Sequence, residues 1–377
     1  MTLRRAGALL VYALVLASCA ATATDASDGS SAPEDVDSQG LVVFQGTGEA
    51  VEGVTVIPLV GSPDFDDSNG SFAVDPNTEP TETDNNGGFS LSYSVTPQVA
   101  GVEVVFDVPA LSGDSAGRFG WREVVDPTGN GQRVEIPNPQ PCNASAQVCG
   151  QPLLPDLTPI ISADDLDPSV AERLEIPDQA PPTAGLFPAS TWFVEQIDGR
   201  RLLRFATVAA NVGDGPLDII AGSPNSDADT AATIQRIWTD TWTFNDVASG
   251  EFVVHPTHDH IHFDAFEQYR LLDDTGAVVA SSEKVSFCLR DSVRVSSEAP
   301  APTGVVFAAA NGDCGDQQQV INPGFGDHYH SLLDDQWIDV TNVPLGRYVL
   351  EITIDPLDLI VESDETNNTG SFTLVIE

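Results

Sequence analysis

Histidine is concentrated in one short stretch of the chain. Of six histidines, four lie in residues 254–263, where His258, His260 and His262 alternate with other residues. Side chains two residues apart point to the same face of a β-strand, and imidazole is a usual ligand for copper, zinc, iron and nickel. The outer two α-carbons of a flat strand would lie about 13 Å apart, so we expect this segment to bend around one metal ion. The alternative is a solvated strand that happens to carry histidines.

A lysine and a tyrosine offer a second kind of chemistry. Among the 15 basic residues, Lys284 is the only lysine, and it follows the histidine cluster. Unlike arginine, lysine has an amine that can lose its proton and attack carbon. Tyr329 stands between the two remaining histidines, His328 and His330. Each residue also has a structural interpretation, Lys284 as a surface side chain and Tyr329 as part of the core.

The first residues of the chain predict export. Arg4 and Arg5 precede an apolar run too short for a permanent membrane helix, and we interpret residues 1–18 as a signal peptide. Cys19 ends the sequence LASC, which resembles a bacterial lipobox; the alternative is an ordinary secretory signal. Residues 19–39 are rich in Ala, Ser, Asp and Glu and predict a flexible linker. We expect an exported cell-surface, outer-membrane or periplasmic lipoprotein, attached to a membrane only by its lipid anchor or released from it.

The charge balance narrows the range of partners. The net charge is −42, from 57 acidic and 15 basic residues. So acidic a surface would repel phosphates, which argues against nucleic acid as a partner. It favours cationic substrates or adaptation to salt, and the sequence does not separate the two.

The remaining cysteines predict disulfide bonds, because an exported chain meets oxidising conditions. Cys142, Cys149, Cys288 and Cys314 allow three connectivities, and proximity in sequence favours Cys142–Cys149 and Cys288–Cys314. The first pair falls in a proline-rich stretch, and we interpret residues 141–152 as a linker.

Apolar patterning predicts a mainly β protein with two domains. Short alternating or apolar segments, such as residues 261–272, are separated by Gly, Asn, Asp and Pro, and few segments have helical periodicity. Residues 40–140 predict a small β-sandwich, which we interpret as a spacer or stabilising module. Its turn at residues 83–89 resembles that of transthyretin-like, carboxypeptidase-regulatory domains. Residues 153–377 predict a second β-sandwich with long loops.

The second predicted domain resembles the catalytic domain of the lysyl oxidase family. The resemblance rests on the histidine cluster, on Lys284 within KVSFCL, and on Tyr329 within DHYH, followed by DQWIDV. Further motifs match in order: PDL, LRFAT with NVG, and ESDETNN near the end. The tryptophan and cysteine of the family's usual Trp-His-x-Cys-His opening are absent here, which leaves loop positions, disulfides and substrate preference open.

The resemblance implies a copper-dependent oxidase of primary amines, of the protein-lysine 6-oxidase type. His258, His260 and His262 would hold copper, and Lys284 and Tyr329 would be the precursors of lysine tyrosylquinone, a cofactor that the protein makes from its own side chains. A primary amine, such as a protein lysine, a polyamine or a small amine, would react with dioxygen to give an aldehyde, ammonia and hydrogen peroxide. The alternative is an extracytoplasmic binding module that holds copper, zinc or calcium without catalysis.

The resemblance also implies a calcium site and leaves the general base open. The calcium ligands would be carboxylate and amide oxygens and one backbone carbonyl, which suit a hard cation. By motif they come from Asp156, Leu157 (through its carbonyl), Glu362, Asp364, Asn367 and Asn368. The general base would be one of the acidic or imidazole side chains beside Tyr329, namely Asp327, His328 or His330.

Overall fold

The computed structural model of this protein is built from β-strands. It describes residues 36–61, 72–74, 79–93, 100–109, 116–125, 130–142, 149–162, 165, 192–224, 230–254, 261–282, 285–296, 304–307 and 317–377. The elements in these ranges are strands, which confirms the predicted mainly β fold. Residues 34–377 form one compact unit. Nowhere in these ranges is there a helix with the length and apolar content that a membrane crossing requires.

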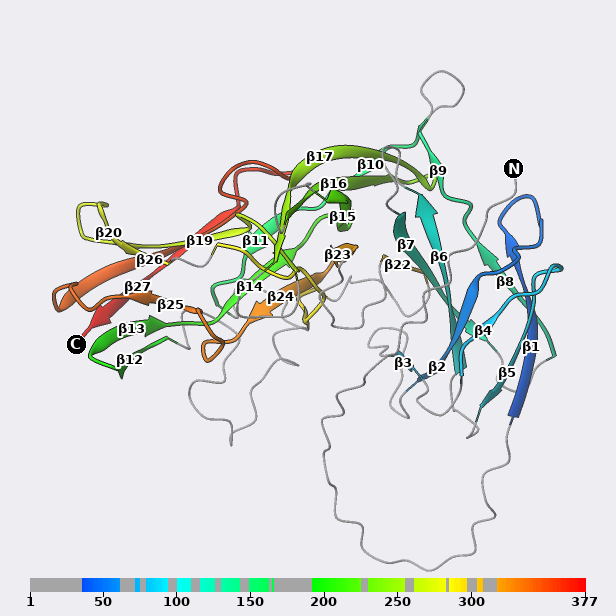
Figure 1. Ribbon diagram of the computed structural model, residues 1–377, viewed down its shortest axis with the longest axis horizontal. Coiled ribbons are helices and arrows are strands. Elements are labelled where there is room, and N and C mark those ends of the chain that lie inside the picture. The colour runs from blue at the N-terminus through cyan, green and yellow to red at the C-terminus, as the bar shows by residue number, and fades with distance from the viewer. Residues whose placement is uncertain are drawn as a thin grey trace, which may run out of the picture. The chain divides into compact units, whose positions relative to one another are not determined.

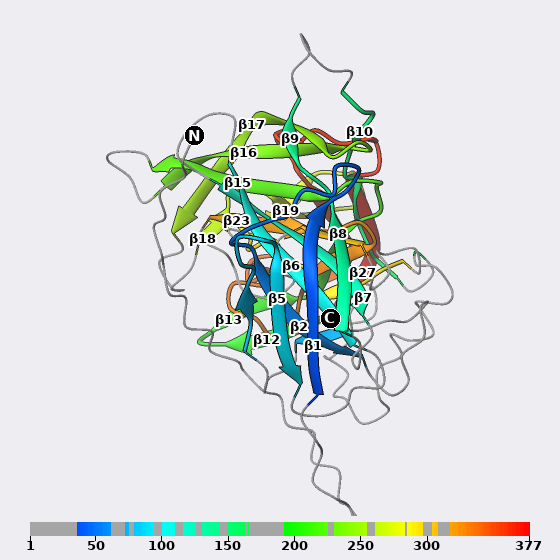
Figure 2. The ribbon, with the colours of Figure 1, turned by 90° about the vertical axis from the view of Figure 1, so that its right-hand side faces the viewer.

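The first part of the chain forms two sheets that pack together (Figures 1 and 2). The three-stranded sheet has the order β5 (Gly88–Tyr93), β1 (Val36–Phe44), β8 (Asn130–Ile136). The six-stranded sheet has the order β22 (Gly304–Phe307), β7 (Ala116–Val125), β6 (Ala100–Pro109), β2 (Thr55–Gly61), β3 (Phe72–Val74), with β4 (Thr81–Glu82) on β2. Buried side chains of both sheets, such as Val42 and Phe89 from one and Val56 and Val104 from the other, form a common core.

The second part of the chain contains four sheets around a larger core. The seven-stranded sheet has the order β18 (Ile261–Phe263), β17 (Thr243–Val254), β16 (Thr230–Thr239), β15 (Leu217–Pro224), β23 (Gln318–Ile321), with β10 (Pro152–Leu153) on β16 and β9 (Gln140–Pro141) on β17. A four-stranded sheet has the order β11 (Leu157–Pro159), β14 (Thr207–Asn211), β24 (Phe325–Tyr329), β21 (Val293–Arg294). A three-stranded sheet has the order β12 (Phe193–Ile197), β13 (Arg200–Arg204), β25 (Trp337–Asp339). A second four-stranded sheet has the order β20 (Val278–Ser281), β19 (Glu267–Leu272), β26 (Gly346–Ile354), β27 (Thr369–Ile376).

Alternation of side chains directs one face of these strands into the core. In β19, Glu267, Tyr269 and Leu271 are buried and the residues between them are partly exposed. The larger core also holds Phe263 and Phe266, each fully buried. Burial of each such side chain contributes about 1.5–3 kcal/mol relative to exposure. The spacing of three between Phe263 and Phe266 does not fit one straight strand, and the chain turns between them at Ala265, whose φ is 54°.

Strand β22 links the two parts of the chain. It lies within the range predicted as the second domain, yet it pairs antiparallel with β7, from Gly304 opposite Arg122 to Phe307 opposite Phe119. An apolar cluster also combines residues of both ranges, with Val108 and Phe119 from the first and Trp238, Phe244 and Val320 from the second. The division into two domains stays a prediction, and the sheets of the two ranges share a strand.

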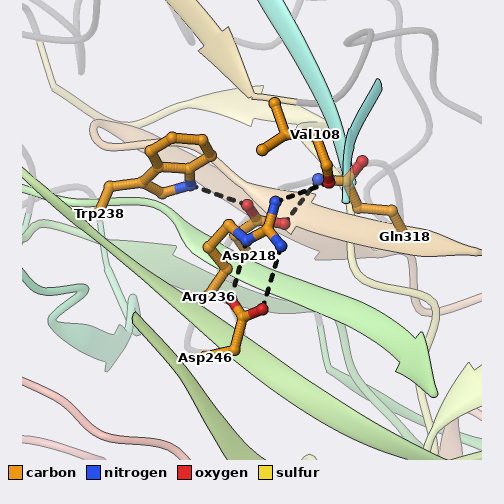
Figure 3. Close-up of polar contacts among 6 residues, drawn as sticks. All are labelled: Val108, Asp218, Arg236, Trp238, Asp246 and Gln318. Carbon is orange, nitrogen blue, oxygen red and sulfur yellow. Dashed lines mark hydrogen bonds and ion pairs between the residues drawn. The ribbon is translucent and has the colours of Figure 1, made fainter. Parts of the chain in front are cut away.

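A buried ion pair lies in this junction (Figure 3). Arg236 is fully buried and donates from Nε and Nη2 to the two carboxylate oxygens of Asp246, at 2.8 and 3.1 Å. Its Nη1 donates to the Val108 carbonyl on β6 at 3.0 Å. The guanidinium also lies 4.0 Å from the centroid of the Phe244 ring, in cation–π range. One side chain on β16 thus connects the sheets of both parts of the chain.

A second buried acid lies beside this pair. Asp218 on β15 accepts hydrogen bonds from Trp238 Nε1 at 2.9 Å and Gln318 Nε2 at 2.6 Å (Figure 3). Burial raises its pKa to about 6, and the charge of Arg236 opposes part of that increase. Gly117 on β7 leaves room here, since a Cβ at that position would lie 2.6 Å from the Ile220 side chain.

The stretch that leads into the second part carries a disulfide bond. Cys142 and Cys149 are bonded, with their α-carbons 5.6 Å apart, as sequence proximity predicts.

Candidate active site around Tyr329 and His262

Of the side chains that the sequence singles out for copper and cofactor chemistry, the structure describes two, His262 and Tyr329. The predicted calcium ligands and Cys288 are also described. The other predicted residues lie outside the described ranges, and their roles stay predictions: Cys19, His258, His260, Lys284 and Cys314.

Tyr329 is the last residue of β24, and it faces the larger core. Across the ladder Tyr329 is opposite Thr207, and Asp327 is opposite Ala209. Successive residues of a strand point to opposite faces, so Asp327 and Tyr329 share the face that packs against the core. His328 belongs to the other face. Because His328 and Tyr329 are neighbours in one strand, their side chains lie on opposite faces of the sheet.

Residues 285–289, which we call the strap, follow Lys284 directly and run beside β18. The Phe287 N–H donates to the Phe263 carbonyl at 3.0 Å, and the Phe263 N–H donates to the Phe287 carbonyl at 2.7 Å. This antiparallel bridge holds the strap against the strand that carries His262.

The amide of Gln319 provides a second attachment between the strap and β18. Its Oε1 accepts from the Leu289 N–H at 3.0 Å, and its Nε2 donates to the Ile261 carbonyl at 2.9 Å. Because Leu289 and Ile261 would be the next pair of an antiparallel ladder, this side chain takes the place of a direct backbone bond.

Cys288 connects the strap to Tyr329. The phenol oxygen accepts from the Cys288 N–H and donates to the Cys288 carbonyl, each at 2.8 Å. The ring packs edge-on against Phe287, with centroids 4.8 Å apart. Cys288 is disulfide-bonded, and its partner lies outside the described ranges, so the predicted bond to Cys314 stays a prediction.

His262 lies close to the other side of the strap. It is 3% exposed, and its Nδ1 lies 3.4 Å from the hydroxyl oxygen of Ser286. Histidines that bind metals through one nitrogen usually hydrogen-bond through the other, so His262 fits the role of one metal ligand. Among the described residues, no cluster of three or more His, Cys, Asp or Glu side chains could hold a metal ion.

A buried polar cluster lies next to Tyr329. Glu267 accepts a hydrogen bond from the Tyr269 hydroxyl, and both residues are at most 1% exposed. The Tyr269 hydroxyl lies 3.1 Å from the hydroxyl of Thr207, the residue opposite Tyr329, and Gln336 donates to both oxygens at 3.3 and 3.4 Å. The cluster connects β19 to β14 at Thr207, the residue that pairs with Tyr329.

The electrostatics of this pocket keep the phenol protonated. Burial raises the pKa of Tyr329 well above its usual range, and the charges of Asp327 and Glu267 raise it further. The hydrogen bond from Cys288 and the charge of Arg290 oppose this increase without reversing it. Two buried acids near one phenol, when ionised, would favour a metal cation or a protonated amine beside it.

The three candidate bases differ in their surroundings. Asp327 shares the face of Tyr329 and accepts from the Ser292 hydroxyl at 2.7 Å. On the opposite face, burial lowers the pKa of His328 to about 4, with further contributions from His330 and Arg290. The buried Nε2 of His328 has no hydrogen-bond partner within the described ranges. Position relative to the ring therefore favours Asp327 over His328.

The predicted calcium ligands come from two stretches that are far apart in the chain, residues 156–157 and residues 362–368, and hydrogen bonds join the two stretches. Asn367 Nδ2 donates to Asp156 at 2.6 Å, and Asn368 Nδ2 donates to Glu362 at 2.7 Å. Glu362 also accepts from the Leu157 N–H at 2.5 Å, so contacts join residues that are 205 positions apart.

Two oxygens of this cluster have no hydrogen-bond partner among the described residues. They are the buried Oδ1 atoms of Asn367 and Asn368. Burial raises the pKa of Glu362 to about 8, the hydrogen bonds from Leu157 and Asn368 oppose this, and the charges of Glu365 and Asp355 raise it further. Oxygen donors in need of a partner, beside two carboxylates, fit a calcium ion. The Asp364 carboxylate instead accepts from Thr366 in its own turn, at 2.9 Å from the backbone nitrogen.

Several residues of the site were not found from the sequence. Glu267, Thr207, Ser286 and Gln336 are common residue types in unremarkable spacing, and only strand pairing brings them to His262 and Tyr329. A buried acid in an alternating apolar strand, such as Glu267, is the one signal that could have been used.

Comparison with known proteins identifies one matching family. Residues 235–376 match the family described as Lysyl oxidase. Lysyl oxidase homolog 1 from Homo sapiens is 40% identical over 116 residues, which cover 30% of this chain and 18% of that protein. Protein-lysine 6-oxidase from Homo sapiens is 39% identical over 116 residues, covering 30% and 25%. Lysyl oxidase homolog 3 from Homo sapiens is 37% identical over 170 residues, covering 45% and 18%. The chain thus spans a quarter or less of the length of these relatives.

Proposed function

We propose, starting from the match of residues 235–376 to the lysyl oxidase family, that this protein oxidises primary amines. One primary amine, one dioxygen and one water would give one aldehyde, one ammonia and one hydrogen peroxide. The observation that carries the proposal is the strap. Its Ser286 lies beside His262 and its Cys288 holds the Tyr329 phenol, and Lys284 immediately precedes it in the chain.

Copper and a quinone made from Lys284 and Tyr329 would supply the redox chemistry and the electrophilic carbonyl of this reaction. His262 would be one metal ligand, with His258 and His260 completing the set. With Nδ1 beside Ser286, Nε2 would be the nitrogen that faces the ion.

The remaining residues would bind, orient and move protons. Phe287 and the larger core exclude water from one side of the ring, which strengthens electrostatic interactions there. The carboxylates of Asp327 and Glu267 would attract a substrate amine in its ammonium form. Asp327, on the Tyr329 face of β24, is the best placed of the three candidate bases to take a proton from substrate carbon.

Calcium would act as a structural ion in the same region of the chain. Asp156, Glu362, Asn367 and Asn368, with the Leu157 carbonyl, are the proposed ligands, and the two unpartnered amide oxygens support this choice. Asp364 would have to exchange its bond to Thr366 for the metal.

The protein would work outside the cytoplasm. Residues 1–18 as a signal peptide and Cys19 as the lipid-bearing residue would hold the enzyme at a membrane surface through residues 19–39. The net charge of −42 suits a partner that carries positive charge, such as an amine, and not a nucleic acid.

The test is the appearance of the cofactor. The purified full chain is loaded with copper in air, and its visible absorbance, a quinone stain and peroxide release with primary amines are measured. We expect colour and peroxide in the unchanged protein. Lys284→Arg should bind copper equally and stay colourless, while Tyr348→Phe, which removes a hydroxyl bonded to the Pro344 carbonyl outside the site, should behave like the unchanged chain.

Two outcomes would contradict the proposal. Colour in Lys284→Arg would exclude the lysine as a cofactor precursor. If the unchanged chain binds copper through His262 but shows neither colour nor peroxide, the protein is better explained as a metal-binding module without catalysis.

A further inference from the structure

The strap is an extended segment with a bonding partner on each side. In a strand, the N–H and C=O of successive residues point in opposite directions. Phe287 exchanges both of its backbone bonds with Phe263 on β18. Cys288 therefore presents its N–H and C=O to the other side, where both bond to the phenol of Tyr329. A single hydroxyl thus takes the place of a neighbouring strand.

This arrangement depends on the proton of the phenol. An O–H group can accept from the Cys288 N–H and donate to the Cys288 carbonyl at the same time. A ring carbonyl at the same position could accept from the N–H but could not donate to the carbonyl. The strap therefore distinguishes an unmodified tyrosine from an oxidised ring by the loss of one of two hydrogen bonds.

We propose that Cys288 is a positioning residue that holds Tyr329 in its unmodified, protonated form next to the strand of His262, and that the strap loosens when the ring oxygen can no longer donate. The disulfide of Cys288 anchors the strap from its side-chain direction. This inference rests on the proposed function, because only a protein that oxidises Tyr329 would use the release. Lys284 directly precedes the strap in the chain, so loosening of the strap would also free the backbone next to the lysine that the proposed cofactor requires.

The charges around the ring support the same role. Asp327, two residues before Tyr329, and Glu267, joined through Tyr269 to the residue opposite Tyr329, both disfavour loss of the phenol proton. Arg290, the cation that acts on this ring, opposes them only in part. The pocket thus preserves the donor that the Cys288 carbonyl requires.

Residue-resolved hydrogen exchange on the metal-free full chain tests the double hydrogen bond. In Tyr329→Phe, the Cys288 amide should exchange about tenfold faster, while the Phe287 amide, bonded to Phe263, should keep its rate. Tyr348→Phe serves as the matched hydroxyl deletion and should change neither amide. A Cys288 amide that exchanges equally slowly in Tyr329→Phe would overturn the inference.

A second measurement does not require the tyrosine to be changed. Carbon-13 NMR at the ring carbon that bears oxygen gives one signal per tyrosine, and Tyr329 should titrate well above the usual pKa range of tyrosine. In Cys288→Ser the strap loses its covalent anchor, and only the Tyr329 signal should shift and titrate at lower pH. The Cys142→Ser, Cys149→Ser double variant, which removes the disulfide of the linker, should leave Tyr329 as it was. An unchanged Tyr329 signal in Cys288→Ser would refute the positioning role.

Copper loading in air separates this inference from the proposed function. If colour forms and the Cys288 amide becomes fast-exchanging in the coloured fraction, both hold. If colour forms while that amide stays slow, the release is wrong and the oxidase proposal stands. If no colour forms but the metal-free measurements agree with expectation, the strap positions Tyr329 and the oxidase proposal fails.

Discussion

Replacement of Arg236 by methionine should strongly destabilise the fold. The side chains of Arg236 and Asp246 are 0% and 2% exposed. Methionine fills much of the same volume but leaves the Asp246 carboxylate buried without the guanidinium, which costs about 3–5 kcal/mol. The Val108 carbonyl also loses a donor at 3.0 Å, for about 1 kcal/mol more. We therefore expect the free energy of unfolding to fall by about 4–6 kcal/mol.

Urea unfolding followed by tryptophan fluorescence measures this loss, because Trp238 lies in the same junction. The midpoint should fall at an unchanged slope. Arg133→Met removes an exposed pair, with side chains 50% and 48% exposed, and should cost less than about 1 kcal/mol.

A double variant separates loss of the pair from loss of volume. Arg236→Met with Asp246→Leu removes both charges and should recover more than half of the loss, because the Asp246 carboxylate is no longer buried without its partner. A loss below about 1 kcal/mol in the single variant would refute the reasoning. It would mean that the pair is solvated and that apolar contacts alone hold the junction.

Three further predictions use titration and metal binding. Burial raises the pKa of Asp218 from its ordinary 3.8 to about 6, so the unfolded form ionises first and stability falls by about 2 kcal/mol as pH rises from 4 to 6. Asp218→Asn should therefore gain stability relative to the unchanged chain between these pH values in urea titrations. The pKa of His328 is lowered from 6.5 to about 4, so its contribution is present above pH 6.5 and is lost, by about 3 kcal/mol, as pH falls to 4. His328→Gln should show a smaller loss of unfolding free energy over that interval, and an equal loss would contradict the assignment. Millimolar calcium should raise the melting temperature of the unchanged chain by several degrees through binding to the native state, and Glu362→Gln should remove most of that increase in a thermal scan. An equal increase in both proteins would place calcium elsewhere.

Local patterning predicted much of the fold, and its failures have a physical cause. Alternation within residues 261–272 indicated strand structure, and β19 within it has one buried face. The segment 261–272 was predicted as one strand, whereas it is two, β18 and β19. Phe263 and Phe266 both enter the core, and period two cannot bury residues three apart. The turn at Ala265 solves this conflict, and the odd spacing was visible in the sequence.

The candidate site was predictable where residue type is informative. The density of histidines and the position of Tyr329 between two histidines identified the segments that form β18 and β24, which the strap joins. Strand pairing was not predictable, so Thr207 and Gln319 were missed. The two-residue periodicity of a strand does place His328 and Tyr329 on opposite faces, so the sequence alone narrows the choice of general base.

The junction and the candidate site are coupled through two consecutive residues of β23. Gln318 donates to Asp218 in the junction, and Gln319 bonds to Leu289 of the strap. Between the strap and β23 the chain supplies β22 to the sheet of the first part. Val320 of β23 also packs in one apolar cluster with Val108 and Phe119 of the first part. A module that served only as a spacer would need none of these bonds, which favours the stabilising alternative for residues 40–140.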